Sequence, residues 1–322
     1  MNHKTIAQMA HVSPSTVSKA LSGSSEVSRE TAEKIRQIAI EVGYFKEKNK
    51  RKRDYSRNHR LLIALIVPEV MGFYYASIIT YIKNKVEAKG GLVAVYISDF
   101  SNEKANYLLR SIIMHSSSDG VIMFSSPDPD INPNVPIITV GNLHQDYDSI
   151  SCDTRLIITD AITYLHNLGH KKIGFVGECN TTVSEKIFKQ ITNCPDDYLY
   201  IVNDRFEAIG IEAADRIAGQ ENRPTALICA YDEIAISLIH QLTKNAIRVP
   251  EDISVMGINN ISSSAYAQIP LTTINTFSAE QYHMAVELLF DKILNETKTV
   301  SHLTIKHRLI ERETTKCTEV DI

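Results

Sequence analysis

The sequence has no long apolar run and no closely spaced cysteines. Its longest uninterrupted apolar segment, residues 61–67, is seven residues long, whereas a membrane-spanning helix requires about 20. The five cysteines are an odd set without a close pair, which is typical of reduced thiols and disfavours a zinc site. No apolar stretch follows a basic cluster at the start, so no signal peptide is expected. These absences predict a cytoplasmic protein.

Motifs of catalysis are also missing. Neither Gly-x-Ser-x-Gly nor Gly-x-x-x-x-Gly-Lys-Ser/Thr occurs, so the residues of nucleophile-elbow hydrolysis and of phosphate-binding loops are lacking. His166 and His170 are four residues apart, as metal ligands often are, but Gly169 is expected to end the helix between them. We therefore predict no enzyme activity, no metal site and no cofactor.

The charge of the chain is unevenly distributed. The 322 residues, 43% of them hydrophobic, are enough for two domains, and the net charge is -4. Residues 1–60 carry 13 Lys and Arg against 6 Asp and Glu, whereas residues 61–322 carry 21 against 32. A basic head suggests a polyanion partner, because cations that neutralise phosphates release condensed counterions. The acidic body is expected to repel the same partner.

The basic head has the pattern of three short helices within residues 2–43. The first helix has apolar residues at the spacing of one face, namely Ile6, Met9 and Ala10. Ser13 is predicted to cap a second helix that begins at Pro14, where the missing N–H costs nothing. Ser28 is predicted to cap the third helix. Two short helices joined by a tight turn and closed by a third form a helix-turn-helix, whose second helix fits the major groove of DNA.

A specific sequence pattern covers this helix-turn-helix. The pattern consists of Val12-Ser13-Pro14-Ser15-Thr16-Val17-Ser18-Lys19-Ala20-Leu21-Ser22, then Val27-Ser28, Thr31 and Gly43-Tyr44. It resembles the DNA-binding head of the LacI/GalR family of transcriptional regulators. The alternative is an ordinary three-helix bundle with a solvated basic face.

The resemblance implies roles for the outward side chains of the second helix. Pro14, Ser15 and Lys19 fall where family members read bases, and the positions near phosphates are Thr16, Ser18 and Ser22. Lys19 stands where an arginine is usual. Because an ammonium group is a point-charge donor and not a bidentate fork, we expect weaker or differently arranged discrimination of guanine at that base.

The segment that follows the head departs from the family. Most relatives carry Pro-Asn-x-x-Ala-Arg-x-Leu there, whereas residues 45–60 of this chain hold eight cations and two anions. One interpretation is a solvated tether. The other is a basic arm, including Lys50 and Arg51, that lies along phosphates or in a narrow minor groove. Both interpretations predict strong salt dependence, but only the arm predicts protection of residues 46–60 by the operator.

The body alternates short apolar runs with segments of helical periodicity. This alternation is typical of βαβ units and of parallel sheets covered on both faces. The predicted strands are Leu61–Val67, Leu92–Ile97, Gly120–Phe124, Ile137–Val140, Ile173–Gly177, Tyr198–Val202, Ala226–Ala230 and Ile253–Ile258. The predicted helices cover roughly residues 73–89, 103–115, 155–168, 181–193, 205–218, 233–246 and 279–295. The predicted fold class is therefore α/β with doubly wound parallel sheets.

The body also resembles the LacI/GalR core, which is similar to a periplasmic sugar-binding protein. The best landmarks are Leu168-Gly169-His170-Lys171-Lys172-Ile173-Gly174-Phe175, Tyr231-Asp232 with Ala235, Val249-Pro250-Glu251-Asp252-Ile253-Ser254-Val255-Met256-Gly257 and Pro270-Leu271-Thr272-Thr273-Ile274. The resemblance implies a head at residues 1–45, a basic linker at 46–60 and an effector-binding and dimerisation domain at 61–322. In that domain, subdomain 1 covers about 61–153 plus 274–296, and subdomain 2 covers about 154–273 plus 297–315.

Ligands of such folds bind beyond the carboxyl ends of the strands, and in this family the effector lies between the two subdomains. The residues expected to contact it are Phe73, Tyr74, Asp153, Lys186, Asp232 and Asn259. Two of them depart from the family, since Asn259 replaces the usual aspartate and Lys186 is only the nearest cation to a missing arginine. Asp232 also has an alternative interpretation as the N-cap of its helix.

The expected protein is thus a homodimeric repressor of genes for carbohydrate use, bound to double-stranded operator DNA and controlled by a small sugar. The missing hinge sequence and Asn259 favour the branch that resembles regulators of galactose and β-galactoside genes, so a galactoside is the hypothetical effector. The alternative is a sugar- or nucleoside-binding protein or enzyme with the same core, which would leave the helix-turn-helix without a purpose.

Overall fold

The computed structural model describes residues 3–21, 26–42, 44, 60–129, 131, 133, 135–141, 143–295, 297 and 299–318. The chain divides into two compact units. The first contains the residues up to Val70 together with Ile79–Ile150 and Tyr282–His302. The second contains Met71–Ile78, Ser151–Gln281 and the residues from Leu303 onward. None of the helices in these described ranges is long and apolar enough to cross a membrane.

The head consists of the helices α1 (His3–Ala10), α2 (Pro14–Leu21) and α3 (Arg29–Glu41). Its core is built from small and branched side chains, namely Ile6, Ala7, Ala10, Val17, Ala20, Ala32, Ile35 and Ala39. Both predicted caps are present, because the N–H of Thr16 donates to Ser13 Oγ and the N–H of Thr31 donates to Ser28 Oγ. The inward position predicted for Met9 is wrong, since its side chain is exposed, whereas Ala7 is buried in the core.

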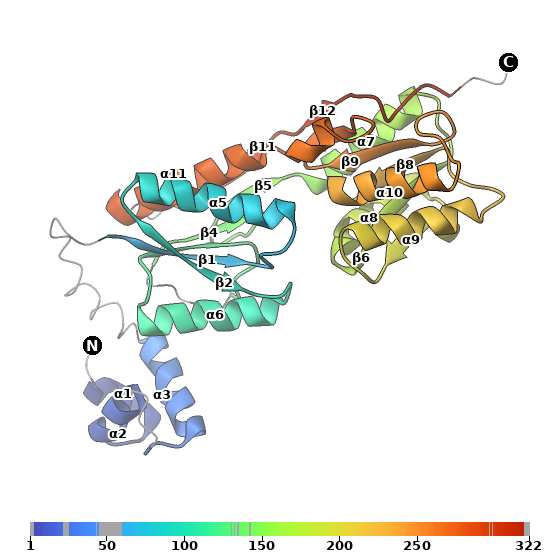
Figure 1. Ribbon diagram of the computed structural model, residues 1–322. Coiled ribbons are helices and arrows are strands. Elements are labelled where there is room, and N and C mark those ends of the chain that lie inside the picture. The colour runs from blue at the N-terminus through green and yellow to red at the C-terminus, as the bar shows by residue number, and fades with distance from the viewer. Residues whose placement is uncertain are drawn as a thin grey trace. The chain divides into compact units, whose positions relative to one another are not determined.

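The sheet of the first unit has the strand order β11-β5-β4-β3-β1-β2. Its strands are β1 (Leu62–Val67), β2 (Leu92–Ile97), β3 (Gly120–Met123), β4 (Ile137–Val140), β5 (Asp148–Cys152) and β11 (His302–Ile305). The pairs β1–β2, β1–β3, β3–β4 and β4–β5 are parallel. The helices α5 (Phe73–Ala88) and α11 (Ser278–Asn295) lie on one face, and α6 (Asn102–His115) lies on the other (Figure 1).

The sheet of the second unit has the order β12-β10-β9-β8-β6-β7. Its strands are β6 (Ile173–Glu178), β7 (Leu199–Val202), β8 (Ala226–Cys229), β9 (Ser254–Ile258), β10 (Thr272–Asn275) and β12 (Arg308–Ile310). The pairs β6–β7, β6–β8, β8–β9 and β9–β10 are parallel, and β12 pairs antiparallel with β10. Two parallel-dominated sheets with helices on both faces confirm the predicted fold class.

Two pairs of helices cover this second sheet. The helices α7 (Thr154–Asn167) and α8 (Thr182–Thr192) bury their apolar faces on one side, with Phe188 against Phe175 of β6. The helices α9 (Glu207–Ala218) and α10 (Asp232–Lys244) cover the other side around Leu227 and Val255. Three short 3-10 turns connect the elements, at Cys179–Thr181, Asp196–Tyr198 and Ser262–Ala265.

The sequence did not predict the strand β10. This strand carries three polar residues in four, but its threonine hydroxyls are buried and bonded. Thr273 Oγ1 donates to Asp232 Oδ1, and Thr272 Oγ1 lies 3.0 Å from Thr315 Oγ1. Because long-range partners satisfy these hydroxyls, a polar segment forms an inner strand that its own pattern does not reveal.

Candidate functional site

The helix α2 presents a small polar face. Pro14, Ser15, Ser18 and Lys19 are exposed, while Thr16 is half-buried and its hydroxyl lies 2.8 Å from Ser13 Oγ. The described residues predicted to contact DNA therefore lie on the outward side of the second helix of the helix-turn-helix, opposite the head's apolar core. Ser22, Lys50 and Arg51, which were predicted to contact DNA as well, lie outside the described residues.

Lys19 has an acidic partner on this face. Its Nζ lies 2.5 Å from Oε2 of Glu26, and both side chains remain substantially exposed. Glu26 precedes the Ser28 cap of α3 by two residues, so the pair joins the end of α2 to the start of α3. An exposed pair of this kind contributes about 0–1 kcal/mol to stability. Its larger effect is on where the ammonium group points.

A second polar cluster lies at the carboxyl edge of the sheet in the second unit. Glu178 is the last residue of β6 and is only 2% exposed. Its Oε1 accepts hydrogen bonds from the guanidinium of Arg205 and, at 3.3 Å, from the hydroxyl of Tyr231. Its Oε2 is buried and has no hydrogen-bond partner within the described part of the chain. A buried carboxylate oxygen without a donor is costly, so this oxygen is an unsatisfied acceptor in the cluster.

Aromatic rings complete this cluster. The guanidinium carbon of Arg205 lies 4.6 Å from the centre of the Phe206 ring, and Phe206 meets Tyr231 edge to face at 6.3 Å. The N–H of Phe206 donates to Tyr231 Oη. Burial and the negative charge of Glu178 raise the pKa of Tyr231, so its hydroxyl stays protonated and acts as a donor. The cluster thus offers a carboxylate, a guanidinium and two rings.

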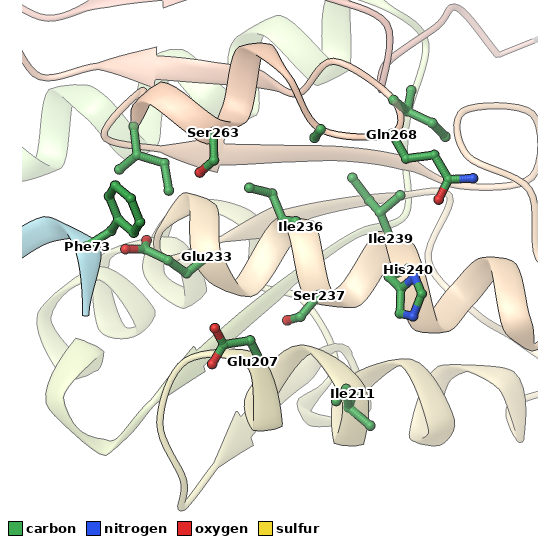
Figure 2. Close-up of a pocket in the computed structure, with 13 residues that line it drawn as sticks. Phe73, Glu207, Ile211, Glu233, Ile236, Ser237, Ile239, His240, Ser263 and Gln268 are labelled. Carbon is green, nitrogen blue, oxygen red and sulfur yellow. The ribbon is translucent and has the colours of Figure 1, made fainter. Parts of the chain in front are cut away.

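A groove of about 460 Å³ lies next to this cluster, within the second unit. It is lined mainly by apolar residues of α9, α10 and the segment 261–269, together with Phe73. Figure 2 shows Glu233 and Glu207 at the same end of the groove as Phe73, with His240 and Gln268 at the opposite end. Both carboxylate oxygens of Glu233 are buried. Burial raises the pKa of Glu233, and the negative charge of Glu207 adds to this effect. The backbone N–H groups of Glu233 and Tyr74 oppose it and lower the pKa.

The structure places the predicted effector residues in different environments. Phe73 is exposed at the groove, and Tyr74 packs edge to face on Tyr75. Asp153 is exposed and caps α7 by accepting from the N–H of Leu156 at 3.0 Å, whereas Lys186 is exposed on α8. Of the predicted residues, Phe73 is the one that lines this groove.

Asn259 and Asp232 lie at the ends of neighbouring strands. Asn259 is half-buried with φ 103° at the end of β9, and its Oδ1 accepts from Thr276. Asp232 is fully buried, and its two oxygens accept from the Thr273 hydroxyl at 2.6 Å and the N–H of Ile261 at 2.8 Å.

Neither role predicted for Asp232 matches this geometry. The N-cap of α10 is Tyr231, and Asp232 is the first residue of the helix, so the capping interpretation is wrong. Because the carboxylate is fully buried and both oxygens are engaged, it presents no surface to a ligand in this conformation. Asp232 instead ties α10 to β10 and to the segment that begins at Ile261.

Sequence reasoning missed Glu178, Arg205 and Phe206. The signal that identifies them is their position directly at or after the strands β6 and β7, because ligands of such sheets bind at the carboxyl edge. Arg205 is the cation that contacts Glu178 in this cluster, whereas Lys186 is exposed on α8. The sequence pattern does not show that these residues contact each other, because Arg205 and Tyr231 lie 27 and 53 residues from Glu178, whose carboxylate they share.

Comparison with known families divides the chain in the same way. The model of the lacI family of bacterial regulatory proteins matches residues 4–47, and that of the periplasmic binding protein-like domain matches residues 162–315. The repressor CytR of Escherichia coli K12 is 27% identical over 90% of this chain and 89% of its own length. Catabolite control protein A of Priestia megaterium is 25% identical over 97% and 98%.

Solved structures share the fold. The lac repressor dimer bound to operator and the anti-inducer ONPF matches with a TM-score of 0.70 and 22% identity, over 97% of this chain and 98% of that one. The regulator CelR in complex with cellobiose matches with a TM-score of 0.66 and 20% identity, over 98% and 99%.

A helix-turn-helix head followed by a periplasmic-binding-protein-like body defines a class of bacterial DNA-binding regulators. Within this class, the chain combines a head of the lacI type with a periplasmic-binding-protein-like domain, and its homologues include LacI-family repressors.

Proposed function

We propose that the protein is a sequence-specific repressor whose affinity for operator DNA is controlled by a small polyol, a sugar or a nucleoside. The observation that carries this proposal is the exposed polar face of α2 on a basic head, joined to a body with a polar cluster at the carboxyl edge of its second sheet. The relatives support it, because they include repressors named CytR and PurR and a ribose operon repressor. A DNA partner places the working protein in the bacterial cytoplasm, and no catalytic activity is proposed.

The cluster of Glu178, Arg205, Phe206 and Tyr231 has the chemistry that a polyol needs. The unsatisfied Oε2 of Glu178 would accept from a hydroxyl that reaches it, the guanidinium would donate to an oxygen, and an aromatic ring would pack against an apolar sugar or base face. Asn259 at the end of β9 adds an amide to the same edge. We extend the proposed contacts to Phe73, Tyr74, Asp153 and Lys186. Asp232 stabilises the same edge of the sheet by accepting hydrogen bonds from Thr273 and Ile261. A galactoside stays one candidate among the polyols.

A homodimer is part of the proposal. A single head reads only a few base pairs, whereas two heads read two half-sites and supply the missing specificity. Each unit has an apolar surface that suits a second copy of this chain. In the first unit it is the exposed edge strand β2, with Leu92, Val95 and Ile97, and in the second it is the groove of α9 and α10. A solved lac repressor of the same fold is described as a dimer on its operator.

Gel shifts test the function. The full chain is mixed with the DNA upstream of its own gene and with a scrambled duplex at physiological salt, with and without sugars and nucleosides. We expect preference for the upstream DNA and a change of that preference by at least one compound. Ligand binding without any DNA preference would overturn the proposal and favour a binding protein or enzyme that kept this core.

Calorimetry tests the effector site. Galactosides, cellobiose, ribose and nucleosides are titrated into the full chain, and the best ligand is then titrated into Glu178→Gln and Arg205→Ala. We expect each variant to bind at least tenfold more weakly, because a hydrogen bond to a charged group is lost in a buried site. Glu212→Gln on the exposed surface of α9 is the control. Unchanged affinity in both site variants would contradict the proposed contacts.

A further inference from the structure

The outward face of α2, which carries the residues predicted to contact DNA, contains one cation, and this cation has an acidic partner. Lys19 is the only basic residue of α2, and its Nζ lies 2.5 Å from Oε2 of Glu26. The two residues are seven positions apart, on α2 and just before α3, so the contact is made by the fold of the head and not by one helix. A carboxylate therefore lies beside the one side chain of α2 that can donate to a base with a positive charge.

A carboxylate in this place is unfavourable for simple affinity. DNA phosphates repel it, and each charge near the duplex changes the number of counterions released on binding. If α2 enters the major groove, as the proposed function requires, Glu26 is carried to the rim of the groove with Lys19. It then weakens every phosphate contact that the ammonium group can make. Affinity for DNA of any sequence is reduced as a result.

The same carboxylate constrains the ammonium group. A lysine has three rotatable donors on a flexible stem and lacks the fixed fork of arginine. When one N–H is directed to Glu26, the position of Nζ is held, and the remaining donors can face the O6 and N7 acceptors of one guanine. A free lysine would instead settle on the nearest phosphate.

We propose that Glu26 is a specificity-determining residue, which positions Lys19 over one base and lowers affinity for non-operator DNA. This inference rests on the proposed function of the head as a reader of DNA. The Lys19–Glu26 pair, in this inference, provides the discrimination between bases that a lysine by itself would lack. Glu26 acts through Lys19 and needs no base contact of its own.

The test uses Glu26→Gln in the full chain, with fluorescence anisotropy on the preferred upstream DNA, on single-base variants of each half-site and on a scrambled duplex. We expect affinity for the scrambled duplex to rise about two- to fivefold, as for the loss of one exposed ion pair. The salt dependence on that duplex should steepen by about one counterion for each head of the dimer. Preference at one base of the half-site should fall, because Nζ is no longer held.

Glu33→Gln is the matched control, since Glu33 is an exposed glutamate of α3, whereas Lys19 pairs with Glu26. It removes the same charge from the same domain and should leave the base preference unchanged. In a Lys19→Ala background, Glu26→Gln should no longer change that preference. Thermal unfolding followed by circular dichroism checks that the head of each variant is folded.

Two outcomes would overturn the inference while the proposed function stands. In one, the wild type prefers its upstream DNA but Glu26→Gln and Glu33→Gln have the same base preference and salt dependence. In the other, Glu26→Gln lowers the base preference by the same factor in the wild-type chain and in the Lys19→Ala background. A wild type without any DNA preference would overturn the proposed function itself, so the two failures are distinguishable.

Discussion

At the scale of single residues, Asp232 shows how burial changes the chemistry of a common side chain. Burial raises its pKa from an ordinary value of 3.8 to about 7, against the opposing hydrogen bonds from Thr273 and Ile261. The carboxyl group therefore takes up a proton in the folded chain at a pH where the unfolded chain is ionised. Its protonation state is coupled to the stability of the second unit.

The sign of this coupling gives a prediction. Because the pKa is raised on folding, the stabilising contribution of the protonated group is complete below about pH 4 and is lost as the pH rises to about 7. Between pH 5 and pH 8 we expect the free energy of unfolding to fall by about 2 kcal/mol through this group. Asp232→Asn should lack this component. Urea unfolding of both proteins at the two pH values measures it, and an identical pH dependence would contradict the assignment.

At the scale of elements, the close approach of α9 and α10 depends on one glycine. A Cβ atom at Gly210 would lie 2.1 Å from Ser237 Oγ and 2.5 Å from the backbone nitrogen of Leu238. The missing side chain lets the two helix backbones approach. This approach forms one wall of the groove and brings Glu207 and Glu233 to the same end of it (Figure 2).

Gly210→Ala should therefore destabilise the body. Because the added methyl group meets backbone and cannot be relieved by a side-chain rotation alone, we expect a loss of about 1–3 kcal/mol. Gly219→Ala is the control, since its Cβ would have no neighbour closer than 3.7 Å. That variant should be neutral or slightly stabilising. The midpoints of urea unfolding compare the two, and equal midpoints would show that the helices can separate at little cost.

The elements themselves were largely predictable. The strands β2 and β4 have the predicted bounds, the helix α2 begins at the predicted Pro14, and the other predicted elements of the body differ by one or two residues at an end. Periodicity and caps act between residues that are close in the chain, so a sequence pattern records them. The strand β10 was missed because its hydroxyls depend on partners as distant as Asp232 and Thr315.

At the scale of the whole molecule, the proposed dimer makes the groove of the second unit a contact surface. Ile211 of α9 lines the groove and is 41% exposed. Ile211→Glu should place a charge in the interface and shift the protein to monomers in sedimentation experiments. Operator affinity should fall by more than tenfold, because the second half-site is lost.

Val183→Glu is the matched control for the dimer. Val183 is 65% exposed on α8, on the face of the sheet opposite α9 and α10. It should leave both the sedimentation and the operator affinity unchanged. A dimeric Ile211→Glu with normal operator affinity would show that the groove is not the contact surface.

The basic segment between head and body gives a second prediction at this scale. Lys50, Arg51, Lys52 and Arg53 lie outside the described residues, but their charges act on any nearby phosphates. Replacing all four by glutamine should reduce the slope of log affinity against log salt by up to about four units for each protomer of the dimer, and equally for every DNA sequence. Anisotropy titrations over a salt series measure this slope. An unchanged slope would place the segment away from the phosphates.

The amino-acid pattern was sufficient for the basic head, its helix-turn-helix, the α/β body and the outward face of α2, because charge, caps and periodicity are local properties. The pairing of Lys19 with Glu26, the shared carboxylate of Glu178 and the burial of Asp232 became known from the folded chain alone. These features arise between residues 7 to 53 positions apart. Packing brings such residues together, and the burial of an oxygen depends on neighbours from several elements at once.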